Sequence, residues 1–121
     1  MKFYLPVEKV LPSQLYLSEK KLAQLRDFKP REEIVLPIQK IEDKIFLTDG
    51  HHRAYLMAKA GVELLPVEWD LDELPMDVYE TCLGWCQESD VRTVLDLTLL
   101  SESEYEEKWI KRCERIGENH G

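Results

Sequence analysis

The 121-residue sequence contains no apolar run approaching the roughly 20 residues that a membrane-spanning helix needs. Its first ten residues hold two lysines and a glutamate, and no apolar segment with a small-residue cleavage site is present, as a secretion signal would require. Cysteine is scarce and odd in number, at three residues, which argues against a disulfide framework and fits a reducing cytosol. We therefore expect a cytoplasmic protein that does not enter a membrane.

The chain also lacks internal repeats and any stretch rich in glycine and serine that would separate two domains. Its length is typical of one domain, and 44% hydrophobic residues are enough to form a core. We expect a single domain over residues 1–121, with a core at 5–70 and a helical extension at 71–121.

Basic residues are scarce in the second half of the chain. Residues 1–67 contain 11 Lys or Arg and 9 Asp or Glu, whereas residues 68–121 contain 5 and 15. A protein that binds duplex DNA needs a basic face, because phosphate contacts dominate its affinity. Direct binding to DNA or to a membrane surface is therefore not expected, and the acidic half is a candidate surface for a protein partner.

Apolar runs and turn residues in the first half predict short strands and two helices. The strands are expected at 7–11, 34–41, 45–48 and 64–69. Pro37 would place the second of these at an edge or a bulge, because proline cannot donate to a sheet. Residues 42–44 would form the turn of a hairpin.

The first helix is expected to begin at Ser18, to carry Leu22, Leu25 and Phe28 on one face, and to end at Pro30. The second begins between residues 50 and 53, and Gly61 stands where a C-terminal cap belongs.

The second half is expected to be mostly helical. One helix carries Val78, Cys82 and Trp85 on a shared face, and a short element follows at 91–97. The last helix opens with Ser101-x-x-Glu104, the spacing of a capping box. Its apolar stripe is Tyr105, Trp109, Cys113 and Ile116. The sequence thus predicts an α+β fold, a small mixed sheet with flanking helices and a helical C-terminal part.

The segment from Thr48 to Arg53, between a predicted strand and a predicted helix, contains the candidate binding residues. Free N–H groups and partial positive charge make a helix N-terminus an anion site. Gly50 removes a side chain where an oxygen would approach the backbone, and Arg53 can hold a phosphate with two parallel hydrogen bonds. His51 and His52 can also donate, and they can change charge near neutral pH.

Asp49 does not suit a bare anion, and several roles stay open for it. It can cap the helix, hold a histidine tautomer, act as a base, or place Mg²⁺ between itself and phosphates. An ordinary Asp-Gly turn followed by two solvated histidines is the alternative without function.

The chain resembles the N-terminal domain of the ParB/sulfiredoxin superfamily. The resemblance covers about residues 5–70 and rests on the order and spacing of several short motifs. These are Val10-Leu11-Pro12-Ser13-Gln14, Leu36-Pro37-Ile38, Gly50-His51-His52-Arg53-Ala54, Ala58-Lys59-Ala60-Gly61 and Leu65-Pro66-Val67. It implies a small mixed sheet with a phosphate-holding Gly-x-x-Arg signature at a helix start.

The branches of this superfamily differ in activity. Partition proteins hold the phosphates of CTP at the signature and carry a DNA-binding domain downstream, for which this chain ends too early. Sulfiredoxins use a cysteine at the position occupied here by His51. Free-serine kinases share Asp-Gly-His-His-Arg, but their catalytic glutamate after the first strand is replaced by Ser13-Gln14.

The resemblance therefore implies a domain that binds ATP, ADP or CTP with Mg²⁺, with the possibility of phosphoryl transfer. Gly50, His51, His52 and Arg53 would hold the phosphates. Asp49 would place the metal or a hydroxyl, and His51 or His52 would stabilise developing charge. A free-serine kinase and a non-catalytic partner of a DNA-partition or mobile-element system remain alternatives.

Cys82 and Cys86 are four residues apart on a predicted helix, where two thiols can face one metal ion. Zinc sites need four ligands, and no spacing supports Cys113 and His120 as the others. We expect buried structural thiols.

Overall fold

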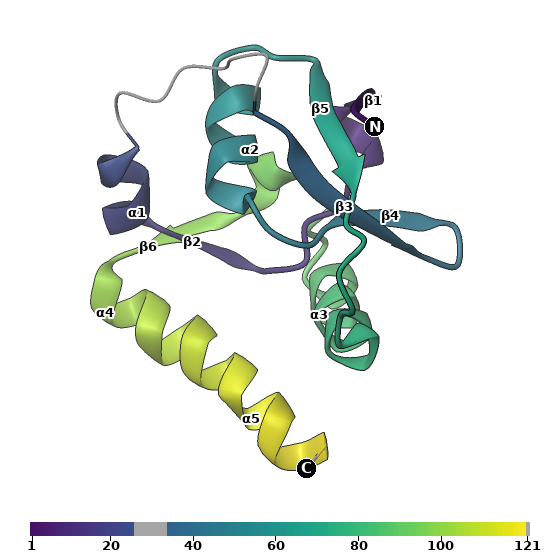
Figure 1. The fold of residues 1–121 in the computed structure, drawn as a ribbon. Helices are drawn as coiled ribbons and strands as arrows, with labels where there is room; N and C mark the ends of the chain where they lie inside the picture. Colours follow the sequence, from purple (N-terminus) through teal and green to yellow (C-terminus); the bar gives the residue numbers. More distant parts are fainter. Residues whose placement is uncertain (26–33, 121) are drawn as a thin grey trace.

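The computed structural model describes residues 1–25 and 34–120, and it shows a mixed α+β protein (Figure 1). The strands are β1 (Phe3–Pro6), β2 (Tyr16–Ser18), β3 (Leu36–Ile41), β4 (Lys44–Leu47), β5 (Leu64–Trp69) and β6 (Thr98–Leu100). The helices are α1 (Glu19–Gln24), α2 (His51–Lys59), α3 (Met76–Glu88), α4 (Glu102–Tyr105) and α5 (Lys111–His120). Two 3₁₀ turns, η1 (Val7–Lys9) and η2 (Val94–Asp96), and the π-helical segment η3 (Glu106–Ile110) complete the order.

Four strands form one sheet in the order β1-β5-β3-β4. The pairs β1/β5 and β3/β4 are antiparallel, and β3/β5 is parallel, so the sheet is mixed, as the sequence predicts. The 34–48 hairpin is confirmed, with Glu42 at a φ of 57° in its turn. A separate parallel pair joins β2 to β6, whereas the sequence predicts no strand at either position.

The strand expected at 7–11 is wrong. Val7–Lys9 is a 3₁₀ turn, in which the Val10 N–H donates to the Val7 carbonyl at 3.2 Å. Val7 and Val10 are both buried while Glu8 between them is exposed, and a spacing of three matches a 3₁₀ turn rather than the alternation of a strand.

Pro37 lies in an internal strand, and the edge position expected for it is wrong. In the register of β3 and β4, Pro37 stands opposite Thr48, whose N–H donates to the Pro37 carbonyl at 3.0 Å. The return bond to the Thr48 carbonyl would need the N–H that proline lacks. The Tyr79 hydroxyl of α3 donates to that carbonyl at 3.0 Å, so the group stays satisfied.

The expected start of the first helix and the expected Gly61 cap of the second are confirmed, but α1 ends at Gln24 with Leu25 as its C-cap, so the expected continuation of this helix to Pro30 is wrong. The Ser18 Oγ accepts the Lys21 N–H at the start of α1, while Phe28 and Pro30 lie outside the described residues. Past the end of α2, Gly61 has a φ of 91° and the Val62 N–H returns to the Met57 carbonyl.

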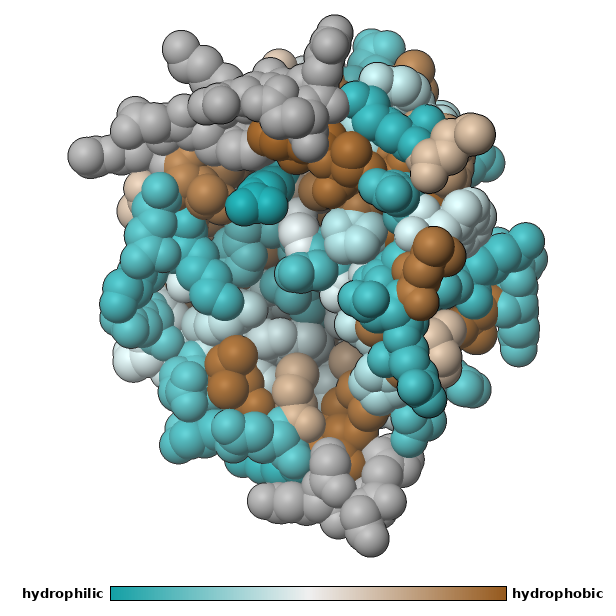
Figure 2. All heavy atoms as spheres, in the orientation of Figure 1, coloured by the Kyte–Doolittle hydropathy of each residue, from teal (hydrophilic) through white to brown (hydrophobic). Residues whose placement is uncertain are grey.

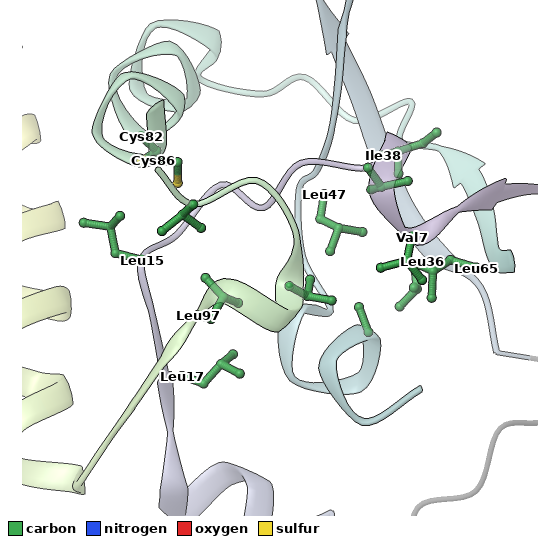
Figure 3. Packing of buried hydrophobic residues seen from close by; sticks show 14 of the residues in the cluster. Val7, Leu15, Leu17, Leu36, Ile38, Leu47, Leu65, Cys82, Cys86 and Leu97 are labelled. Atoms are coloured by element: carbon green, nitrogen blue, oxygen red, sulfur yellow. The ribbon is translucent and has the colours of Figure 1, made fainter. Parts of the chain in front are cut away.

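The second half of the chain contributes to the same core as the first. Leu15 and Leu17 from the first half belong to the same cluster of buried side chains as Leu97 and the α3 residues Cys82 and Cys86 (Figure 3). The expected stripe of the last helix is buried at Tyr105, Trp109 and Ile116, and Ser101 caps the helix by accepting the Glu104 N–H.

The surface is largely polar on the face seen in Figure 2, where hydrophobic residues form separate small groups. Nowhere in residues 1–25 and 34–120 is there a helix long and apolar enough to cross a membrane.

Candidate functional site

The first turn of α2 opens into a cleft of about 400 Å³ between α1, the segment after Pro12, and the end of α4. All five residues from Asp49 to Arg53 line it, so the structure brings the sequence-predicted site together. The full lining is Gln14, Lys21, Gln24, Leu25, Asp49, Gly50, His51, His52, Arg53 and Tyr105.

Gly50 makes the turn that starts α2. Its φ of 77° is in the left-handed region, where a side chain costs roughly 1–2 kcal/mol. A Cβ placed on Gly50 would lie 3.0 Å from Cδ2 of Leu36, a core residue. The missing side chain therefore makes room for the core, and the approach of a ligand oxygen to the Gly50 backbone stays a prediction.

Asp49 does not cap α2. It is exposed, and its Oδ1 accepts the N–H of Gly50 at 2.8 Å. Among the described residues, no side chain makes an N-cap hydrogen bond to this helix, and the first intrahelical bond runs from the Ala54 N–H to the Gly50 carbonyl at 2.9 Å. The N–H groups of the first turn are therefore left for water or a ligand.

His51 ties the start of α2 to the segment after Pro12. Its Nε2 accepts the Ser13 N–H at 2.9 Å, and the Ser13 hydroxyl donates to the Leu47 carbonyl at 2.7 Å. Burial, with a smaller effect of His52, lowers the pKa of His51 to about 3. His51 is therefore neutral at physiological pH, and because Nε2 accepts, its proton is on Nδ1.

His52 makes the matching bond one residue along. Its Nε2 accepts the Ser18 N–H at 2.9 Å, and its ring meets the Tyr105 ring edge-on at 6.2 Å. Burial and Lys21 lower the pKa of His52 to about 4, against the opposing effect of Asp49. The expectation that His51 and His52 change charge near neutral pH is therefore wrong, and both act here as neutral acceptors that hold one wall of the cleft.

The positive charge of the cleft comes from Arg53 and Lys21. Both side chains are exposed, and Arg53 makes no ion pair with a described carboxylate. The Lys21 Nζ lies 5.2 Å from the centre of the Tyr105 ring. Sequence reasoning missed Lys21 and Tyr105, because no local motif links either residue to the 49–53 segment.

A metal ion has few protein ligands here. Within the described ranges, no three His, Cys, Asp or Glu side chains are grouped to hold one, and Asp49 is the single carboxylate of the cleft lining. Mg²⁺ commonly binds through one or two carboxylates together with substrate phosphates. Asp49 fits that mode through Oδ2, since Oδ1 is engaged by the Gly50 N–H.

No protein-family model matches the chain, and no curated protein matches it. A solved structure of the protein Atu1540 from Agrobacterium tumefaciens is similar, with a TM-score of 0.56 at 16% sequence identity. The similarity covers 81% of this chain and 61% of the other, so this chain spans about three fifths of that protein's length. At this identity the likeness concerns the fold alone.

Proposed function

We propose that the cleft at the start of α2 binds the phosphates of a nucleotide. The observation that carries this proposal is the convergence of an uncapped helix N-terminus with Arg53 and Lys21 on one open cleft. Helix N–H groups and the helix dipole favour a phosphate, and a guanidinium matches it with two parallel hydrogen bonds. A volume of about 400 Å³ falls within the usual range of ligand pockets, roughly 300–1,000 Å³.

The proposed ligand is ATP, ADP or CTP with Mg²⁺. The N–H groups of residues 51–53 and the Arg53 guanidinium bind phosphate oxygens, and Lys21 adds a charge from the opposite wall. Asp49 contributes one oxygen to the metal, which neutralises phosphate charge when bound. The resemblance to the ParB/sulfiredoxin superfamily supports this assignment, since the Gly-x-x-Arg signature stands at the start of α2, directly after the β3–β4 hairpin.

Phosphoryl transfer to serine is a weaker proposal, because a general base must reach the acceptor hydroxyl. Gln14 lines the cleft at the place where the kinase branch has glutamate, and an amide does not take up a proton at neutral pH. Glu8 lines a different cleft, with Ala58 and Gly61 at the other end of α2. We therefore expect nucleotide binding with weak or no phosphoserine formation from serine, Mg²⁺ and ATP or ADP. Robust turnover that disappears in Glu8→Gln would overturn this expectation.

A non-catalytic role beside a protein partner remains compatible with the cleft. The α4–η3 segment exposes Glu102, Glu104, Glu106 and Glu107, which suits contact with a basic partner surface. We propose a cytoplasmic location for either role.

Thermal unfolding in the presence of ATP, ADP, CTP or GTP, with and without Mg²⁺, tests nucleotide binding. A ligand at a hundred times its dissociation constant adds about 2.7 kcal/mol to the native state, which raises the midpoint by roughly 10 °C for a domain of this size. No shift with any nucleotide, at concentrations up to several millimolar, would refute the proposal.

Arg53→Ala should weaken nucleotide binding by about 1.5–3 kcal/mol, because a hydrogen bond to a charged group is lost. Arg53→Lys should restore only part of the affinity, since an ammonium cannot make the two-pronged contact. Lys59→Ala is the matched control: it removes one positive charge from the opposite end of the same helix. Calorimetric titration of the four proteins should separate Arg53→Ala from the control. Equal losses in both would mean that net charge, not the signature arginine, governs binding.

A further inference from the structure

A small pocket lies where the C-terminal half of α3 meets β4. The rings of Tyr79 in α3 and Phe46 in β4 are 5.4 Å apart, so the helix packs against this strand (Figure 1). The pocket has a volume of about 210 Å³ and lies between Leu83 of α3, Lys44 of β4 and the segments that follow η1 and α3. None of the described residues that line it also lines the cleft at the start of α2, so it is a separate cavity.

Backbone hydrogen bonds fix two walls of this pocket. On one side, the Leu11 N–H donates to the Ile45 carbonyl and the Leu47 N–H donates to the Leu11 carbonyl, each at 2.9 Å. On the other side, the Val91 N–H donates to the Cys86 carbonyl at 2.8 Å and closes the turn at the end of α3. The main chain therefore sets the shape of the pocket, as is usual for small-molecule sites.

The inner part of the pocket is apolar and uncharged. Its side chains are buried, and they are Pro12, Leu83, Cys86 and Val91. The Cys86 thiol donates to the Gln14 carbonyl at 3.4 Å, and burial raises its pKa to about 11, so this sulfur stays neutral at physiological pH. An apolar ligand body would lose its contact with water here, which is favourable.

The outer part of the pocket has a net positive charge. Lys44, Asp90 and Arg92 line it and are exposed. The Arg92 Nε donates to Asp90 Oδ1 at 2.9 Å, so these two charges compensate each other. Lys44 makes no ion pair with a described carboxylate. One positive charge thus remains for a ligand with one negative charge.

The volume of the pocket restricts the ligand to a small molecule. An apolar cavity of about 150 Å³ holds benzene, so about 210 Å³ has room for one ring or one branched chain together with a carboxylate. Pockets for drug-sized ligands are larger, at roughly 300–1,000 Å³, and a nucleotide does not fit here.

We propose that this pocket binds a small monocarboxylic acid with an apolar body. The body packs against Pro12, Leu83 and Val91, and the carboxylate lies at Lys44. The proposal does not depend on nucleotide binding at the other cleft.

The test is a titration of the full, ¹⁵N-labelled chain with phenylacetate, followed by amide chemical shifts. Phenylacetamide is the matched control, because it has nearly the same shape and no charge. We expect saturable shifts at Leu11, Lys44 and residues 83–92, with a dissociation constant of about 1 mM or lower, and weaker binding of phenylacetamide. The absence of saturable shifts at tens of millimolar, equal affinity for phenylacetamide, or shifts centred on residues 49–53 would each overturn the proposal.

Lys44→Gln tests the contact with the carboxylate. The variant should weaken phenylacetate binding about two- to fivefold, the range for an exposed ion pair, and should leave phenylacetamide binding unchanged. Lys40→Gln is the matched control, because it removes one positive charge from the same hairpin but does not line the pocket. Equal losses of phenylacetate affinity in the two variants would contradict the proposed position of the carboxylate.

Gln87→Trp tests the position of the apolar body. Gln87 lines the pocket and is exposed, so an indole added there fills the pocket without entering the core. The thermal midpoint should stay near that of the wild type, because exposed positions tolerate substitution. Phenylacetate binding should fall below detection. Wild-type affinity in the folded variant would show that the ligand binds elsewhere.

Discussion

Two clefts of nearly the same volume, about 400 Å³ each, flank the turn before α2, and Asp49 lines both. The first contains Lys21, Arg53 and the free N–H groups of α2. The second lies at the end of β5 and is lined by Val35, Pro37, Asp49, Glu68, Trp69, Asp70, Leu71 and Asp72. One cleft therefore favours anions, whereas four carboxylates make its neighbour repel them.

The two clefts therefore differ in the charge of the residues that line them and not in their size. In the second cleft, the Asp70 carboxylate accepts hydrogen bonds from the Thr48 hydroxyl at 2.7 Å and from the Asp72 N–H at 3.0 Å. These bonds stabilise the turn before α2 through a charged side chain. In the first cleft, the polar side chains that hold the structure are the neutral His51 and His52, and neither Lys21 nor Arg53 forms an ion pair with a described carboxylate.

Lowering the pH should have the largest effect of these tests, because histidine side chains hold a wall of the first cleft and none lines the second. The folded-state pKa of His51 is far below that of the unfolded chain, so the unfolded state binds more protons and acid favours it. The contribution of His51 is complete above about pH 6.5, the unfolded-state value, and is lost as pH falls towards 3, with a total of up to several kcal/mol. Urea unfolding at a series of pH values measures it.

Carboxylates also titrate in acid, so the comparison needs a variant. His51→Gln keeps an acceptor for the Ser13 N–H and removes the titration, and its stability should fall less steeply between pH 6.5 and 4. If wild type and variant show the same slope, the neutral-histidine account of this cleft wall is wrong.

Gly50→Ala breaks the turn that joins the two clefts. The substitution combines left-handed strain with a contact of 3.0 Å to Leu36, and we expect a loss of about 2–3 kcal/mol in the free energy of unfolding. Gly61→Ala is the matched control, because Gly61 has a φ of 91° but open space around its Cβ position. Its loss should be strain alone, about 1–2 kcal/mol. Equal losses would show that the Leu36 contact costs nothing.

Removing a single charge from either cleft should have the smallest effect on nucleotide affinity, and the two clefts should differ in the sign of that effect. Lys21→Ala should weaken nucleotide binding by about 1 kcal/mol, as expected for an exposed charge. Asp72→Asn, in the acidic cleft, should leave affinity unchanged or raise it by less than about 0.5 kcal/mol. Calorimetric titration at low salt measures both. A larger loss of affinity in Asp72→Asn than in Lys21→Ala would place the ligand in the acidic cleft at the end of β5, against the proposal.

Local signals in the sequence predicted much of the fold. The β3–β4 hairpin, the start of α2, its Gly61 cap and β5 all lie where apolar runs and turn residues indicate. They were predictable because the deciding interactions, such as a glycine at positive φ, act within a few residues. The strand predicted at 7–11 was wrong. The buried residues Val7 and Val10 are three positions apart, a spacing that matches a 3₁₀ turn and not the alternation of a strand.

The sequence by itself indicated the contiguous part of the candidate site, since Asp49 to Arg53 follow one another and lie at the start of a helix. Tertiary structure decided what each residue does. The acceptors of Ser13 and Ser18 are histidines 38 and 34 residues away, and burial among those partners keeps both imidazoles neutral. Lys21 and Tyr105 join the cleft only because α1 and α4 fold beside α2. Proton affinity and charge pairing depend on solvent exclusion and on distance in space, and neither is encoded in local spacing.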